Sequence, residues 1–293
     1  MGKLERARAE IAPVATALST GVPVLSDRDL ATIMRLVYEK SGITLHSGKR
    51  ALVTARLQKP LRQSGFNTFR DYIRHLESDR SGLELTAMLD AIATNHTSFF
   101  REAQHFSFLT SVVLPALSER SATDPILGWC AACSSGEEPY TIAMTAFEHF
   151  GEGAGRMIRL LGSDLSTKAL HRAAAGLYKV ERVESIPRHL VLKYFDRQQV
   201  PPGTVRISER IRRTVEFRHW NLLDSPPAGR QFDFIFCRNV LIYFDRAVQQ
   251  RVIERLEERV APGGYLFTSH SESLNGLRHR LTWVAPAVYR RDA

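Results

Sequence analysis

A chain of 293 residues with 44% hydrophobic residues is long enough for two domains, and it lacks the run of roughly 20 apolar residues that a membrane-spanning helix needs. Its formal net charge of +9 favours an acidic partner, which includes nucleic acid, a membrane surface and an acidic protein. Residues 1–20 contain no uninterrupted apolar segment, which argues against a secretory signal, so we expect a cytoplasmic protein that is not embedded in a membrane.

The three cysteines do not suggest a framework of disulfides, because their number is small and odd. Cys130 and Cys133 form a C-x-x-C motif that follows Trp129, which is similar to the redox motif of thioredoxin. The residues between these two cysteines are not those usual in a redox pair, and Cys237 alone cannot complete a zinc site. We therefore predict no metal site and keep a redox function as a lesser alternative.

The region from residue 22 to residue 92 is predicted to form an all-helical domain. It follows an N-terminal tail, residues 1–21, whose role the sequence does not indicate. Apolar residues recur at helical spacing in four segments, which are residues 27–43, 49–65, 69–79 and 83–94. The second segment contains Pro60, which predicts a kink or an early break in that helix.

From residue 93 to residue 293 the pattern changes to short apolar runs that alternate with helical segments. The strand candidates are residues 125–132, 157–164, 232–239 and 264–271. Such alternation is typical of an α/β domain in which helices cover a parallel sheet. Residues 176–218 interrupt the pattern, because TVRIS and TVEFRH alternate as short antiparallel strands do, so we predict a small inserted β-subdomain there.

Ligands of open α/β sheets bind at the carboxyl ends of the strands, so the residues that follow each predicted strand are candidates for a site. After the first strand, Gly136 allows a tight turn into a helix whose first turn contains Glu137 and Glu138. Two acids are electrostatically unsuited to a pyrophosphate, and they favour a ligand with positive groups. S-adenosylmethionine carries an ammonium and a sulfonium group and meets this requirement.

Polar residues also follow the other predicted strands. Asp164 is placed either to bind a ribose diol or to cap the next helix, for which Ser166 is an alternative cap. Asn221 and Leu222 are suited to frame an adenine with an amide and an apolar contact. Asn239 follows a buried strand and is therefore expected at the edge of the cleft.

Two features near the end of the chain allow more than one interpretation. Tyr243 is either an aromatic residue of the core or a hydroxyl group of the site. The SHSES segment, residues 269–273, has a composition that would suit Ser/His catalysis. Adjacent side chains of a strand point to opposite faces, however, and no G-x-S-x-G motif precedes the segment, so we predict no nucleophilic serine there.

Six segments together are similar to the CheR family of chemotaxis receptor methyltransferases. They are TNHTSFFRE (94–102), CSSGEEPYTIA (133–143), GSDLSTKAL (162–170), NLLD (221–224), FDFIFCRNVLIYF (232–244) and APGGYLFTSHSESL (261–274). Their order and spacing match the family over nearly all of residues 25–285. The resemblance implies a small helical domain, a Rossmann-like methyltransferase domain over residues 93–293 and an inserted β-subdomain. It also implies a protein-glutamate O-methyltransferase that uses S-adenosylmethionine, yields S-adenosylhomocysteine and acts in chemotaxis adaptation.

The resemblance carries functional roles over to individual positions. Contacts with S-adenosylmethionine are implied for Asn95, Thr97, Arg101, Glu137, Asp164, Asn221, Leu222, Arg238 and Asn239. Arg101 and Tyr243 match the residues that lie closest to methyl transfer, so they are the predicted catalytic residues. His96 departs from the family pattern, in which an apolar residue is often found at this position.

As partner, the resemblance implies the cytoplasmic helical region of a methyl-accepting chemoreceptor, and we expect the enzyme to be a monomer. Lys49, Arg56 and Lys59 share one predicted helix, where they either bind an acidic receptor helix or form only a solvated face. Some family members also dock a receptor tail on the β-subdomain by strand addition. The loop at residues 198–204 is rich in Pro and short of Gly here, unlike the loop of family members that bind such a receptor tail well.

Two other functions remain as alternatives. A nucleic-acid methyltransferase would suit the positive charge, but the chain has no N-P-P-Y motif and no interleaving of basic and aromatic residues, so we expect no nucleic-acid partner. A cofactor-binding sensor without transfer activity is the second alternative, and the presence of Arg101 and Tyr243 argues against it. A glutamate acceptor needs no general base, because its pKa of about 4.3 leaves it ionised at neutral pH.

Overall fold

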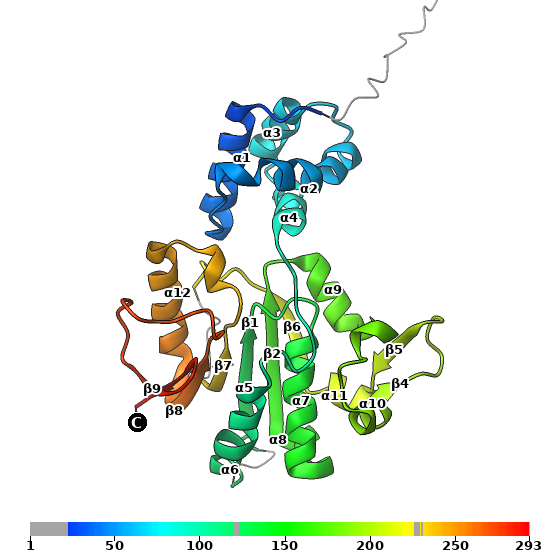
Figure 1. The fold of residues 1–293 in the computed structure, drawn as a ribbon, viewed down its shortest axis with the longest axis vertical. Coiled ribbons are helices and arrows are strands. Elements are labelled where there is room, and N and C mark those ends of the chain that lie inside the picture. The colour runs from blue at the N-terminus through cyan, green and yellow to red at the C-terminus, as the bar shows by residue number, and fades with distance from the viewer. Residues whose placement is uncertain (1–22, 120–122, 226–228, 230, 293) are drawn as a thin grey trace, which may run out of the picture.

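Two regions of different architecture follow one another along the chain (Figure 1). The computed structural model describes residues 23–119, 123–225, 229 and 231–292. The predicted tail, residues 1–21, lies outside the described residues. Within the described ranges, no helix is both long and apolar enough to cross a membrane.

The N-terminal region consists of helices that pack around one apolar cluster. Its α-helices are α1 (Asp27–Ser41), α2 (Arg50–Gln63), α3 (Phe69–Ser78) and α4 (Leu83–Ile92). Side-chain caps define two of their N-termini, because Ser26 accepts a hydrogen bond from the N–H of Asp29 and Thr68 accepts one from the N–H of Asp71. The four predicted helical segments are therefore confirmed.

Helix α2 continues through Pro60 and ends at Gln63, so the predicted early break is wrong. Leu57 and Leu61, on either side of the proline, are fully buried in the apolar cluster of the helical region. Their packing offsets the loss of the backbone hydrogen bond that proline cannot donate.

The larger region is built on a seven-stranded sheet with the strand order β6-β2-β1-β7-β8-β10-β9. Its strands are β1 (Ile126–Ala131), β2 (Ile158–Asp164), β6 (Val215–His219), β7 (Phe232–Phe236), β8 (Val260–Phe267), β9 (Leu281–Ala285) and β10 (Val288–Arg291). Strands β6, β2, β1, β7 and β8 are parallel to one another, and β10 runs antiparallel to both β8 and β9. The predicted α/β fold with a largely parallel sheet is confirmed.

Helices cover both faces of this sheet (Figure 1). They are α5 (Ala103–Phe108), a π-helical turn (Leu109–Val113), α6 (Leu114–Ala116), α7 (Glu137–Phe150), α8 (Ala154–Met157), α9 (Thr167–Ala175) and α12 (Arg246–Arg259). Side chains alternate along each strand, so Cys130 and Phe234 join the apolar cluster that includes α7. Trp129 and Ile235 point to the other face and join the cluster that includes α12.

Gly128 of β1 is needed because the neighbouring strands bring side chains close to its backbone. A Cβ atom at this position would lie 2.3 Å from Cε2 of Phe234 and 2.7 Å from Cδ2 of Leu160. We expect Gly128→Ala to lower the free energy of unfolding by about 1–3 kcal/mol, as overpacked cores do, and urea unfolding would measure this change. Gly153→Ala is the control, since a Cβ there meets no atom within 4 Å. Equal destabilisation of both variants would contradict the steric argument.

The inserted β-subdomain differs from the prediction at its C-terminal end. An antiparallel sheet of order β3-β5-β4 is formed by β3 (Leu177–Lys179), β5 (Thr204–Ile207) and β4 (Phe195–Asp196), with the helices α10 (Arg188–Tyr194) and α11 (Glu209–Arg212) beside it. The prediction of an antiparallel strand at TVEFRH is wrong, because β6 pairs in parallel with β2 at the edge of the main sheet. The alternation of Val215 and Phe217 indicates a strand but does not identify its partner.

Candidate active site

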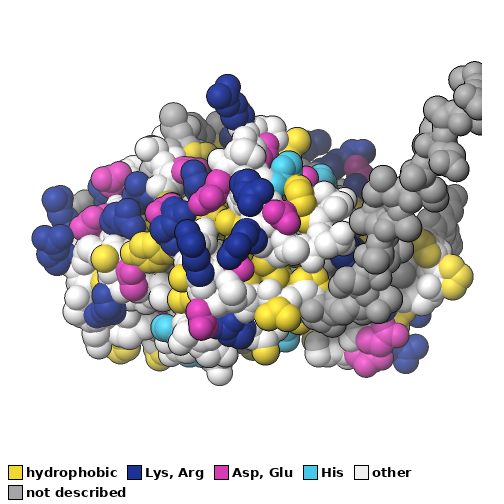
Figure 2. All heavy atoms as spheres, turned by 90° about the horizontal axis from the view of Figure 1, so that it is seen from above, with side chains coloured by type: hydrophobic (Ala, Val, Ile, Leu, Met, Phe, Trp, Pro, Cys, Tyr) yellow, Lys and Arg dark blue, Asp and Glu magenta, His cyan; other side chains and the backbone are white. Residues whose placement is uncertain are grey.

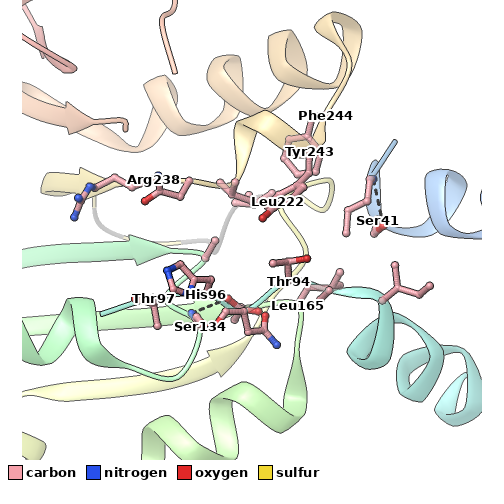
Figure 3. A pocket seen from close by; sticks show the side chains of 18 of the residues that line it. Ser41, Thr94, His96, Thr97, Ser134, Leu165, Leu222, Arg238, Tyr243 and Phe244 are labelled. Carbon is pink, nitrogen blue, oxygen red and sulfur yellow. Dashed lines mark hydrogen bonds between the residues drawn. The ribbon is translucent and has the colours of Figure 1, made fainter. Parts of the chain in front are cut away.

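A cavity lies at the carboxyl ends of the parallel strands, between the sheet and the helical region (Figure 3). Its walls come from the turns that follow β1, β2, β6 and β7, and from residues 92–101, which join the two regions. The chain adds β2 on one side of β1 and later adds β7 on the other side, so the cavity lies where the strand order reverses. Open α/β sheets bind their ligands at this position.

The turn after β1 is held against the end of β2. Ala132 and Ser134 have positive φ angles of 85° and 51°, a backbone conformation that residues other than glycine seldom adopt. The N–H of Ala132 donates to the carbonyl of Ser163 at 2.8 Å, and the N–H of Ser134 donates to the carboxylate of Asp164 at 2.8 Å. These hydrogen bonds keep the strained turn in place beside the cavity.

Asp164 connects this turn to the start of α9. One of its carboxylate oxygens accepts from the N–H of Ser134, and the other accepts from the N–H of Ser166 at 2.8 Å. Ser166 is the cap of α9, because its hydroxyl accepts from the N–H of Ala169, so the alternative that Asp164 caps this helix is wrong. Burial raises the pKa of the Asp164 carboxyl, while the two N–H groups act in the opposite direction. Each oxygen keeps a lone pair for a ligand hydroxyl, as a ribose contact requires.

The two acids at the start of α7 have different surroundings. Glu137 is fully buried, accepts from the Ser135 hydroxyl and pairs with Arg182 of the inserted subdomain at 2.6 Å. Glu138 lines the cavity, and its carboxylate accepts from Arg238 at 3.0 Å. The cavity is therefore lined by Glu138, whereas Glu137, for which the resemblance implies a cofactor contact, is not among the lining residues and pairs with Arg182.

Arg238 is a buried cation between two acids. Its side chain is 1% exposed, and its guanidinium lies 3.2 Å from Glu102 and 3.0 Å from Glu138. The ring of Phe106 lies 5.7 Å from the guanidinium carbon. Burial acts to raise the pKa of Glu102, but Arg238 and the Ser269 hydroxyl outweigh this effect and lower the pKa to about 2. Glu102, which ends the TNHTSFFRE segment, thus holds a cavity residue, Arg238, although no role was predicted for it.

The acidic side chains of the cavity suit a positively charged ligand. Burial raises the pKa of the Glu138 carboxyl, and the nearby Arg238 is the main influence that favours its ionised form. Glu138 and Asp164 both line the cavity, whereas Glu102 pairs with Arg238 without lining it. The cofactor predicted for this cavity, S-adenosylmethionine, carries a cationic sulfonium and a cationic ammonium group. The acidic residues of the cavity therefore fit this cofactor.

The two predicted catalytic residues both line the cavity. Arg101 lies on the segment that joins the two regions, and its guanidinium donates to the carbonyl of His96 at 2.9 Å. Tyr243 ends a short 3-10 helix, Leu241–Tyr243, in the turn region after β7. Figure 3 places Tyr243 on the same wall as Leu222, with Thr97 and Ser134 across the cavity.

The helical region is hydrogen-bonded to the segment that contains Tyr243. The N–H of Thr44 donates to the carbonyl of Tyr243 at 2.8 Å, and Ile43 forms an isolated β-bridge with Phe244. The hydroxyl of Tyr38 also donates to Asp245 at 2.7 Å. The helical region therefore supplies part of the framework of the site, and is not only connected to it through the chain.

The other residues predicted to contact the cofactor, apart from Glu137, also line this cavity. The cavity is lined by Asn95, Thr97, Arg101, Asp164, Asn221, Leu222, Arg238 and Asn239, and also by Trp220 and Ser134, for which no individual role was predicted. Asn221 has a second task, since its side-chain amide donates to the carbonyl of Lys40 at 2.6 Å and so joins the two regions. The residues predicted from the strand ends thus meet in one place.

The three predicted substrate-binding residues, which lie on α2 and directly before it, are not equivalent. Lys49 and Arg56 line the cavity, whereas Lys59 is exposed and lies outside it. Arg56 donates to the Thr94 hydroxyl at 3.1 Å and to the carbonyl of Ile92, so its guanidinium supports the joining segment. Figure 2 shows Lys and Arg side chains gathered near the middle of the face viewed from above, with acidic side chains between them. This face is basic but mixed in sign.

The C-x-x-C motif lies in the core and not at a reactive surface. Cys130 and Cys133 are both buried and free, and burial raises the pKa of both thiols well above the usual range. A redox cysteine requires an accessible thiolate, so the geometry disfavours the redox alternative.

Three potential metal ligands, Glu102, His105 and His270, lie together, with ligand atoms within 4.8 Å of one another. One oxygen of Glu102 is already 3.2 Å from Arg238, whose charge opposes a cation. Since this carboxylate is already committed to Arg238, we assign no metal to the cluster.

Comparisons with known proteins agree with this geometry. Residues 95–289 match the family described as "CheR methyltransferase, SAM binding domain", and residues 28–93 match "CheR methyltransferase, all-alpha domain". A chemotaxis protein methyltransferase of Borreliella burgdorferi is 36% identical over 90% of this chain and 94% of its own length. Proteins of the same description from Escherichia coli and Klebsiella aerogenes are 37% and 40% identical, each over 90% of this chain and over 91% and 90% of their own lengths.

These matches span both regions of the structure, including the six segments on which the predicted resemblance rests. The prediction of the family and of its cofactor, S-adenosylmethionine, is confirmed. The chain belongs to the CheR methyltransferase family and is an S-adenosylmethionine-dependent methyltransferase.

Proposed function

We propose that the enzyme methylates glutamate side chains in the cytoplasmic helical region of a methyl-accepting chemoreceptor, and so acts in chemotaxis adaptation. The observation that carries this proposal is the composition of the cavity. The carboxyl groups of Glu138 and Asp164 line the cavity, and so do the basic side chains of Lys49 and Arg101. A cavity with acidic and basic side chains suits both a cationic donor and an anionic acceptor.

The proposed reaction is the attack of a glutamate carboxylate oxygen on the methyl carbon bound to the sulfonium of S-adenosylmethionine. A carbon–oxygen bond forms, the carbon–sulfur bond breaks with its electron pair going to sulfur, and the product is a neutral ester. The acceptor is ionised at neutral pH, so the protein needs to position it and exclude water, without a general base. Arg101 is placed to orient a carboxylate, and Tyr243 offers a hydroxyl at the same cavity.

The proposed partner also explains part of the charge of α2. Lys59 and Arg62 are exposed on this helix, and Lys49 lies at its start beside the cavity. An acidic receptor helix that crosses this face would gain favourable electrostatic interactions and be guided towards the cavity. Under this proposal the methylated receptor region lies in the cytoplasm, so we also propose a cytoplasmic enzyme. We further propose that it is a monomer and has no nucleic-acid partner.

Replacement of Tyr243 by phenylalanine tests the catalytic side of the proposal. We expect kcat for methylation of a receptor cytoplasmic fragment to fall about tenfold, because the hydroxyl at the cavity is lost, with S-adenosylhomocysteine affinity within twofold of wild type. Transfer of a radiolabelled methyl group into base-labile esters measures the reaction. Tyr265→Phe is the control, since Tyr265 lies in β8 and does not line the cavity.

Two results would contradict the proposal. A wild-type enzyme that binds S-adenosylhomocysteine but labels no receptor glutamate would favour the sensor alternative. Methyl label that appears in added nucleic acid, and not in the receptor fragment, would favour a nucleic-acid substrate.

A further inference from the structure

The SHSES segment, residues 269–273, has no part in the mechanism described above, but it lies directly behind the loop that contains Tyr243. Its acid, Glu272, is 5% exposed. No Lys or Arg in the described parts of the chain forms an ion pair with it. Burial raises the pKa of the Glu272 carboxyl, which several backbone N–H groups oppose. A buried carboxylate without a cation is unfavourable unless it is well hydrogen-bonded, so its contacts indicate what it does.

The carboxylate of Glu272 joins two turns at the edge of the sheet. One of its oxygens accepts from the N–H of Asn239 at 2.8 Å and from the N–H of Ser269 at 3.0 Å. The other oxygen accepts from the N–H of Ile242 at 3.2 Å. Asn239 and Ile242 belong to the loop after β7, and Ser269 belongs to the turn after β8, so one side chain fixes the backbone of both.

The loop after β7 turns sharply at Asn239. This residue has a φ of 57°, a left-handed conformation that asparagine adopts more readily than most residues other than glycine. Its side-chain amide donates to the Ser269 hydroxyl at 2.7 Å, and that hydroxyl lies 2.9 Å from Glu102. Residues 269–272 therefore hold both the backbone and the side chain of Asn239, and they connect this residue to the charged cluster of Arg238.

We propose that Glu272 is a positioning residue for methyl transfer, whose carboxylate holds the loop from Asn239 to Tyr243 so that both residues keep their places in the cavity wall. The inference rests on the proposed role of Tyr243. It assigns a function to the acid of the SHSES segment, while the serine and histidine beside it have no nucleophilic role.

Glu272→Gln is a strict test because it preserves the size of the side chain. The amide of glutamine has one acceptor oxygen, whereas the carboxylate has two. In the variant, the NH2 group would therefore face a backbone N–H that is bonded to a carboxylate oxygen in the wild type. We expect kcat for receptor methylation to fall about tenfold, since small displacements of reacting groups have large effects on rate. The rate is normalised to binding-competent sites, counted by calorimetric titration with S-adenosylhomocysteine. A merely structural role would reduce the number of such sites and leave kcat per site and KM unchanged.

A double-mutant cycle with Tyr243→Phe tests whether Glu272 acts through that residue. In the Tyr243→Phe background, Glu272→Gln should reduce kcat by less than about threefold, because the positioned hydroxyl is already absent. Ser273→Ala is the control from the same segment, since Ser273 is exposed and its hydroxyl accepts locally from the N–H of Asn275. If Glu272→Gln does not fold, Ser269→Ala removes only the hydroxyl between Asn239 and Glu102 and should lower kcat per site about threefold.

The outcomes separate this inference from the proposed function. Failure of the wild-type enzyme to methylate the receptor fragment would contradict the proposed function itself. The role of Glu272 would be overturned in two cases in which the wild-type enzyme methylates the receptor fragment. In the first, Glu272→Gln leaves kcat per site unchanged. In the second, Glu272→Gln lowers kcat per site equally in the wild-type and Tyr243→Phe backgrounds.

Discussion

Arg238→Ala should destabilise the protein by about 3–5 kcal/mol at neutral pH, which is the effect expected when one partner of a buried ion pair is removed. The guanidinium lies 3.2 Å from Glu102 and 3.0 Å from Glu138, and its side chain is 1% exposed. Without it, two largely buried carboxylates, 16% and 13% exposed, would lie near each other with no cation between them. Urea unfolding of the variant and of the wild type would measure the difference in free energy.

The same variant has a distinctive pH dependence. In the folded wild type the pKa of Glu102 is about 2, below the value of about 4.3 for an unfolded chain. A carboxyl whose folded pKa is depressed contributes stability above its unfolded pKa and loses that contribution as the pH falls towards the folded pKa. The Arg238→Ala variant lacks this contribution at every pH. The difference in free energy of unfolding between the variant and the wild type should therefore shrink as the pH falls from about 5 to about 2.

The control for Arg238 is Arg218→Ala, which removes a largely exposed partner of Glu216. Exposed pairs contribute little, so this variant should unfold almost as the wild type does. An Arg238→Ala deficit that is as large at pH 3.5 as at pH 7 would contradict the assignment of the loss to Glu102 and Glu138.

Asp164→Ala should weaken the binding of S-adenosylhomocysteine by about a hundredfold, which corresponds to about 2.7 kcal/mol. The substitution removes the acceptor of the predicted ribose contact. It also leaves the N–H groups of Ser134 and Ser166 without the oxygens that hold the turn after β1. Hydrogen bonds to a charged group contribute about 1.5–3 kcal/mol each, so the loss of one ligand contact together with a looser turn accounts for this magnitude. Calorimetric titration measures the affinity.

Two variants make the Asp164 result specific. Asp164→Asn keeps one acceptor oxygen and should lose only about tenfold in affinity. Asp196→Ala removes an exposed acid of β4, away from the cavity, and should bind as the wild type does. Unchanged affinity in Asp164→Ala, with the protein folded, would exclude Asp164 from the cofactor site.

The sequence predicts the elements and the place of the site, because both depend on local patterns. Helical spacing locates the N-terminal helices, and strand ends locate the residues that line the cavity, from Asp164 to Asn239. The partner of a strand depends on packing between distant segments, which is why the alternation of Val215 and Phe217 indicates β6 but assigns it to the wrong sheet. Tertiary packing likewise carries α2 past Pro60.

For charged side chains, too, local sequence patterns do not predict the contacts made between distant segments of the chain. The sequence cannot decide between Glu137 and Glu138, because adjacent residues of a helix differ by 100° in direction and only the fold shows which of them meets Arg238. Arg56 fits a basic stripe by its spacing, yet its guanidinium is used by the segment that joins the two regions. The pairing of Glu102 with Arg238, and the contacts of Glu272 with the loop after β7, join segments far apart in the chain.

The hydrogen bond from Thr44 to Tyr243 and the bridge between Ile43 and Phe244 make the helical region and the cavity one thermodynamic unit. If the methyl donor and a receptor segment both bind this arrangement more tightly than others, the receptor segment raises the affinity for the donor. By linkage, the donor then raises the affinity for the receptor by the same factor. Titrating each ligand in the presence of the other would give this coupling as a single number, with equal values from both directions.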